Sequence, residues 1–186
     1  MRGVFYFYTM HSFIKDVVKR LSSSKISFSE YTFILPNKRS ALSLKKEISS
    51  FQNTDIISPI IFEIDEFMQH ISGFKKMEET ELYFDFYKCY LENNSKENEI
   101  QPFDEFISWA KLMLVDFNEI DREICETEKL FDYVNAFKEL NHWSFQEKET
   151  ELLKKYILFW RNLNPYYNLL TKKLIAKKRA YQGKIY

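Results

Sequence analysis

The scarcity of glycine constrains this chain more than any other feature of its sequence. Glycine occurs only at positions 3, 73 and 183 of the 186 residues, and proline occurs only four times. So few turn-forming residues disfavour a turn-rich all-β fold. The phosphate-binding motifs GxxxxGK[ST] and GxGxxG are both absent. We therefore expect a largely helical or α/β chain with no nucleotide cofactor.

Apolar patterning predicts an α/β region followed by an all-α region. Residues 1–75 are predicted to contain a helix capped by Ser12, a strand at 31–35, a helix beginning near Asn37 or Ser40, a strand at 56–64 and a short helix closed by Gly73. Residues 1–9 are either a strand or an extension upstream of the true start. Residues 76–186 show helical periodicity, with the last helix beginning at Asn164–Pro165. The prediction is thus a small parallel-sheet subdomain, 1–75, and a helical subdomain, 76–186.

The segment TFILPNKRSALSLKKEI carries the clearest candidate for a binding site. Its strand ends at Pro36, and the following helix has a predicted buried side made of Leu42, Leu44, Ile48 and Phe51. The N-terminus of a helix presents free backbone N–H groups that attract phosphate even without glycine. The predicted DNA-binding residues are Asn37, Lys38, Arg39, Ser40, Lys45 and Lys46. The alternative is that Asn37 only caps the helix and the basic side chains are only solvated.

Charge is distributed unevenly although the formal net charge is zero. Residues 1–51 hold nine Lys and Arg against three acids, residues 77–132 hold sixteen acids against five bases, and residues 152–186 hold nine bases and no acid. The two basic ends could form one positive surface, with the lysines of 172–184 as a second contact for DNA. The alternative is that these are simply the solvated faces of helices.

Other catalytic or metal-binding patterns are weak. Asp116, Glu119, Asp121 and Glu123 could bind a divalent cation, but a solvated helix end is the favoured interpretation, and neither CxxC nor HExxH occurs. Cys89 and Cys125 lack metal-ligand neighbours, which indicates reduced thiols in a cytoplasmic protein. No run of eighteen apolar residues predicts a membrane span.

Several segments resemble one known family. YTFILPNKRSALSLKKEI resembles motif Ia of superfamily I helicases, where a strand and turn lead into a helix that touches single-stranded DNA. IISPIIFEIDEFMQHIS is similar to the segment that follows that motif. PNKRSA at 36–41, FDEFISWAKLMLVDFNEIDR at 103–122 and AYQGKIY at 180–186 are more closely similar to the AddB-like, helicase-derived N-terminal region of bacterial PD-(D/E)XK nucleases of the Bacteroidetes type. The resemblance covers residues 10–186.

This resemblance implies a helicase-like 1A subdomain with a helical 1B-like insertion, acting in DNA break repair or recombination. Its partners would be single-stranded or duplex-end DNA and the remainder of a nuclease chain. The ATP-binding loop expected before motif Ia is replaced by MHSFIKDVVKRL. An inactivated helicase region that neither hydrolyses ATP nor cuts DNA is therefore expected. The alternative is a structural module that docks on the rest of its parent protein without binding DNA.

Overall fold

The computed structural model describes residues 5–24, 26–51, 57–94, 100–143 and 151–186. The chain is mostly helical and divides into unit 1, Met1–Ile71, and unit 2, Ser72–Tyr186. The division lies just before the predicted boundary at residue 75. Residues 75 and 76 belong with unit 2 because they pair there with a strand near the C-terminus.

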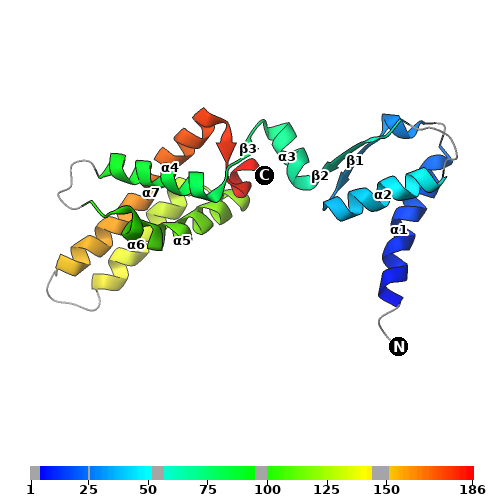
Figure 1. Ribbon diagram of the computed structural model, residues 1–186. Coiled ribbons are helices and arrows are strands. Elements are labelled where there is room, and N and C mark those ends of the chain that lie inside the picture. Colours follow the sequence, from blue (N-terminus) through cyan, green and yellow to red (C-terminus); the bar gives the residue numbers. More distant parts are fainter. Residues whose placement is uncertain (1–4, 25, 52–56, 95–99, 144–150) are drawn as a thin grey trace. The chain divides into compact units, whose positions relative to one another are not determined.

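Unit 1 contains a parallel two-stranded sheet, and a helix lies between its two strands in the sequence (Figure 1). Strand β1, Thr32–Leu35, pairs with β2, Ile60–Glu63, in the register Thr32 opposite Ile60. Helix α2, Lys38–Phe51, connects them, and α1, Phe5–Ser22, precedes them. The predicted strand–helix–strand order is confirmed, although β2 is shorter than the predicted 56–64.

The core of unit 1 lies between the helices and one face of the sheet. Val18, Phe28, Leu44 and Ile48 are buried there, and Phe33 packs against them from β1. Helix α3, Ile64–Ser72, follows β2 directly, with Asp65 and Glu66 in its first turn. These acids complement the helix dipole.

Two predictions for unit 1 are wrong in detail, and one open alternative is excluded. Helix α1 begins at Phe5, so Ser12 lies inside the helix and does not cap it. Of the two alternatives for residues 1–9, a strand is excluded for residues 5–9. No glycine or proline lies between Phe5 and Ser12, so the helix extends from Ser12 back to Phe5. Leu42 and Phe51 were predicted to be buried but are 67% and 42% exposed. Leu42 lies on the side of α2 opposite Leu44 and Ile48, and Phe51 is the last residue of the helix, beyond the part that the small core covers.

Unit 2 is a bundle of long helices. Its elements are β3 Lys75–Lys76, α4 Glu79–Asn93, α5 Phe103–Arg122, α6 Thr127–Trp143, α7 Glu151–Lys177, β4 Arg179–Ala180 and α8 Gln182–Ile185. Gly73 has a φ of +72°, which glycine tolerates, and it ends α3 as predicted. The parallel pair β3–β4 was not predicted, so residues 76–186 are not entirely helical.

The prediction that a new helix begins at Asn164–Pro165 is wrong. The helix runs through Pro165 without interruption. A proline inside a helix removes one backbone hydrogen bond and costs about 3 kcal/mol. The neighbouring side chains of Leu163, Tyr166 and Tyr167 are all buried in the core of unit 2, and this packing offsets that cost.

Candidate nucleic-acid interface

The turn between β1 and α2 is held by a helix cap. The Ser40 backbone N–H donates to Asn37 Oδ1 at 2.9 Å, and the Ser40 hydroxyl donates to the same oxygen at 3.1 Å. Both donors of Ser40 are therefore engaged by Asn37. The structure places these two predicted site residues in the cap, where they orient the helix. The backbone N–H groups of Lys38 and Arg39 precede the first intrahelical hydrogen bonds and face the start of the helix.

The four predicted basic residues lie on one exposed surface of α2. We call Lys38, Arg39, Lys45 and Lys46 the basic stripe; all four are exposed. Lys38 and Lys45 are seven residues apart, as are Arg39 and Lys46, and this spacing is close to two helical turns or about 10 Å. The structure thus brings the four cations together in two short rows.

Leu42 lies within the basic stripe. It follows Lys38 by four residues and precedes Lys46 by four, so it shares their side of the helix. Its high exposure places an aliphatic side chain among the cations, on the side opposite Leu44 and Ile48. The basic stripe therefore includes one exposed apolar side chain.

One acid lies close to the basic stripe. Glu63, the last residue of β2, has its carboxylate 3.8 Å from Lys38 Nζ. The Lys38 side chain is 81% exposed, so this ion pair is weak and leaves the ammonium group accessible to solvent. The carboxyl ends of two parallel strands therefore meet at the basic stripe, which is the edge where α/β sheets bind ligands.

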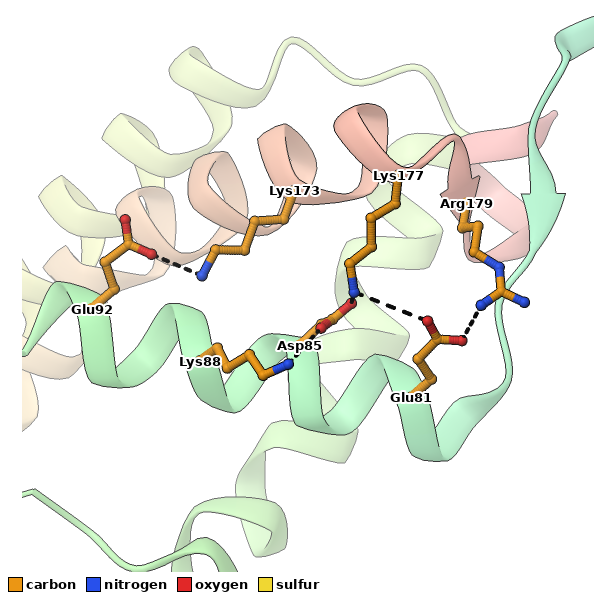
Figure 2. Close-up of polar contacts among 7 residues, drawn as sticks. All are labelled: Glu81, Asp85, Lys88, Glu92, Lys173, Lys177 and Arg179. Atoms are coloured by element: carbon orange, nitrogen blue, oxygen red, sulfur yellow. Dashed lines mark hydrogen bonds and ion pairs between the residues drawn. The ribbon is translucent and has the colours of Figure 1, made fainter.

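The C-terminal lysines, which were a possible second contact for DNA, are largely paired with acids inside unit 2. Figure 2 shows Lys173, Lys177 and Arg179 facing Glu92, Asp85 and Glu81 of α4. Lys173 Nζ lies 2.8 Å from Glu92 Oε2, and this hydrogen bond lowers the pKa of the Glu92 carboxyl below its usual range.

Asp85 lies at the centre of these pairs and is 2% exposed. It accepts from Lys177, and Lys88 Nζ approaches its other oxygen at 3.5 Å (Figure 2). The acidic and basic segments of the sequence therefore neutralise each other across α4 and α7. The spacing of Glu81, Asp85, Lys88 and Glu92 along one side of α4 was a signal for this pairing that the charge counts did not reveal.

A second polar cluster joins α5 to the C-terminus. Asp121 accepts hydrogen bonds from the hydroxyls of Tyr167 and Tyr181 and from Lys184 Nζ, the last at 2.7 Å. We call these four residues the Asp121 network. Helix α5 and the C-terminal segment 180–186 thus meet in this network.

Gly183 makes a close approach beside this network. Its N–H donates to Asn118 Oδ1 at 2.7 Å, and a Cβ at this position would lie 2.1 Å from the backbone oxygen of Asn118. Only glycine therefore allows α8 to approach α5 this closely. The sequence singled out both segments but held no signal that they touch.

The acidic cluster of α5 is explained by these contacts. Asp121 belongs to the Asp121 network, whereas Glu119 and Glu123 pair with Arg122. Burial raises the pKa of the Asp116 carboxyl. Within the described ranges, no three His, Cys, Asp or Glu side chains are grouped in a way that could hold a metal ion.

The two cysteines are both free thiols. Burial raises the pKa of the Cys89 thiol to about 11, which keeps it protonated at neutral pH and disfavours its reaction as a nucleophile. Cys125 is exposed. A search of the described helices for one long and apolar enough to span a bilayer found none.

Comparison with known proteins found no match to a family model, to a curated protein or to a solved structure.

Proposed function

We propose that this chain is a non-catalytic DNA-binding module that holds the phosphate backbone with the basic stripe of α2. The observation that carries the proposal is the grouping of four exposed cations on the first turns of a helix, directly after a parallel strand. Phosphate contacts of this kind position a protein on nucleic acid without reading its sequence. The proposed ligand is single-stranded or duplex-end DNA.

The family resemblance supplies the biological setting of this proposal. Residues 36–41 and 103–122 resemble the inactivated helicase region of AddB-like nucleases, so we propose a role in DNA break repair or recombination in the cytoplasm. In this setting the remainder of a nuclease chain is the second partner. The proposed module binds DNA but neither hydrolyses ATP nor cleaves a strand.

Removing two charges from the basic stripe is expected to weaken DNA binding. The variant Lys38→Gln with Arg39→Gln should bind a labelled single-stranded oligonucleotide about tenfold more weakly at low salt, since two phosphate contacts are lost. The slope of log affinity against log salt should fall by about 0.7 for each lost contact. Fluorescence anisotropy at several salt concentrations measures both quantities.

The matched control is Lys19→Gln with Arg20→Gln. This exposed Lys–Arg pair lies in the last turn of α1, in the same unit, and its substitution removes the same number of charges. The control should keep the affinity and salt slope of the unaltered chain. Equal losses in the two double variants would mean that binding depends on net charge, and the assignment of the basic stripe would be wrong.

A second candidate function, docking on another protein surface, is favoured by the sheet of unit 1. Parallel sheets are almost always covered on both faces. Ile34 and Ile60 are 43% and 54% exposed, so the face opposite the core carries apolar side chains in contact with solvent. In the part of the chain that the structure describes, β1 and β2 each pair on one side only.

Fluorescence anisotropy together with light scattering distinguishes DNA binding from protein docking. A chain that binds no oligonucleotide at low salt, and that self-associates by light scattering, would favour docking through this uncovered face. Salt-sensitive binding by a monomer, diminished in the Lys38 and Arg39 variant, would favour the DNA-binding proposal.

A further inference from the structure

Unit 2 contains an aromatic pocket that has no part in the contacts described above. Its volume is about 750 Å³, within the range of roughly 300–1,000 Å³ that is typical of small-molecule sites. The C-terminal end of α4, the start of α5 and the middle of α7 line it. The aromatic side chains of the lining are Tyr90, Trp109, Tyr156, Phe159, Trp160 and Tyr166.

The walls and floor of the pocket differ in exposure. Tyr90 and Tyr166 are 6% and 3% exposed and belong to the core. Trp109 and Phe159 are half-buried, with ring centroids 5.2 Å apart and planes at 87°. A planar ring placed in the pocket would thus meet aromatic surfaces in more than one orientation, and these surfaces are already held by packing.

Amide side chains accompany the aromatic ones, and Gln101 makes three of the hydrogen bonds at the pocket. Its side-chain oxygen accepts from Trp109 Nε1 at 3.0 Å, and its backbone N–H donates to the Tyr90 hydroxyl at 3.0 Å. Its backbone carbonyl also accepts from Tyr87. These three contacts fix the residue, while its side-chain NH₂ has no acceptor among the described residues.

A second amide group lies on α7. Asn162 Oδ1 accepts from Asn93 Nδ2 at 3.3 Å, which again leaves the NH₂ group of Asn162 without an acceptor among the described residues. Asn94, 2% exposed, donates to the Tyr166 hydroxyl at 2.7 Å. The lining of the pocket therefore combines held aromatic rings with the amide NH₂ groups of Gln101 and Asn162.

We propose that this pocket binds an unstacked nucleobase. A base has a planar π face that stacks on aromatic side chains and carbonyl or ring-nitrogen acceptors that pair with amide donors. An apolar peptide side chain or acyl chain would cover the rings but leave the amide donors unpaired, at a cost in free energy. The lining holds one cation, Lys155, and one carboxylate, Glu105, so it offers a free phosphate no net positive charge, and a phosphate would gain nothing from the rings.

This inference goes beyond phosphate binding by the basic stripe and does not depend on it. The test titrates the full chain with deoxyguanosine monophosphate and, separately, with deoxyribose phosphate, while tryptophan fluorescence is recorded. Trp109 and Trp160 line the pocket and report its occupancy. We expect saturable quenching at millimolar nucleotide and none with the sugar phosphate. Equal responses to both ligands, or no saturable response to the nucleotide, would overturn the proposal.

Two matched variants locate the site. Phe159→Leu removes an aromatic wall but keeps an apolar side chain, and it should weaken nucleotide binding at least about fivefold, as expected for the loss of a stacking partner. Phe137→Leu makes the same change at a 49% exposed ring that stacks on Tyr133 of α6, outside the pocket lining, and should leave binding unchanged. Equal weakening by both variants would contradict the proposal.

Two further measurements keep the test decisive. Should Phe159→Leu fail to fold, the indole N–H resonances of Trp109 and Trp160 in the unaltered chain are expected to shift with nucleotide, and unmoved resonances would overturn the proposal. The variant Lys38→Gln with Arg39→Gln should retain mononucleotide binding, which separates this pocket from the basic stripe. Quenching by an apolar peptide and not by the nucleotide would instead identify a protein-docking pocket and overturn nucleobase binding.

Discussion

Replacing Asp121 with Ala is expected to lower the free energy of unfolding of unit 2 by about 3–5 kcal/mol. The Asp121 side chain is 10% exposed and accepts from two tyrosine hydroxyls and from Lys184. Removal of the carboxylate leaves the Lys184 ammonium group, 17% exposed, without its charge partner. Urea denaturation followed by circular dichroism measures the loss.

Glu123→Ala is the matched control for this variant. Glu123 comes from the same acidic segment, but its side chain is 66% exposed and its ion pair with Arg122 spans 3.6 Å. Such a surface pair contributes between zero and about 1 kcal/mol. Similar losses at Asp121 and Glu123 would mean that the Asp121 network does not anchor α8, and that the C-terminus is held by apolar contacts alone.

The Asp121 network also predicts how stability depends on pH. Burial, and then the hydrogen bond to Asp121, raise the pKa of the Tyr181 phenol above its ordinary value of 10.0. Between the ordinary pKa of 10.0 and the raised pKa of the folded state, the unfolded chain has released a proton that the folded chain retains. The contribution to stability is therefore complete below about pH 10 and is lost as the pH rises further, by up to about 1.4 kcal/mol per pH unit for this phenol.

Tyr181→Phe tests this pH dependence because phenylalanine has no proton to release. Its free energy of unfolding should decline less steeply above pH 10 than that of the unaltered chain. The Tyr167 phenol, whose pKa is also raised by burial and by Asp121, still contributes in the variant. Parallel alkaline profiles for the two proteins would show that Tyr181 titrates alike in the folded and unfolded states.

The strand–turn–helix of unit 1 could be predicted because its signals are local. An apolar run, Pro36 and the capping residue Asn37 lie within a few positions of each other, and each favours the same structure. The basic stripe followed from the same pattern, since the positions of cations on a helix depend only on their spacing. Its nucleic-acid ligand is a proposal that the spacing alone does not test.

The parts that sequence patterns missed depend on contacts between distant residues. Phe51 has the spacing of a buried residue, three positions after Ile48 and seven after Leu44, but its exposure is decided by how far the core of unit 1 extends. Pro165 is a strong local helix breaker, yet the helix continues through it because Tyr166 and Tyr167 are both buried in the core of unit 2. Tertiary packing outweighs local preference at both positions.

The same argument applies to the candidate sites. Lys173 and Lys177 formed part of a basic segment in the sequence, but their acidic partners on α4 lie more than eighty residues earlier. Gln101 and Asn162 come from separate segments, and no spacing rule places them at one aromatic pocket. Local patterns predicted the surface of one helix, while the pocket and the networks required the fold.

Replacing Phe86 with Ala is expected to destabilise unit 2 by about 3–5 kcal/mol. Phe86 is completely buried on α4, and its ring makes edge-on contacts with Phe106, Trp109, Phe117 and Tyr166, at centroid distances between 5.2 and 6.2 Å. These partners come from α5 and α7, so the substitution opens a cavity where three helices meet. Urea denaturation measures the loss of stability.

The neighbouring Phe84→Ala provides the comparison. Phe84 lies on the same helix but is 49% exposed, and its ring stacks on Phe103 at 4.9 Å. Its loss should cost about 1 kcal/mol, the value of a single aromatic pair. The Phe86 ring packs against Trp109 and Tyr166, which line the aromatic pocket. Its replacement should therefore also weaken the quenching of tryptophan fluorescence by the nucleotide, whereas Phe84→Ala should not. A Phe86 variant as stable as the Phe84 variant would mean that the helices close around the cavity, and that the pocket walls are less rigidly held than this packing indicates.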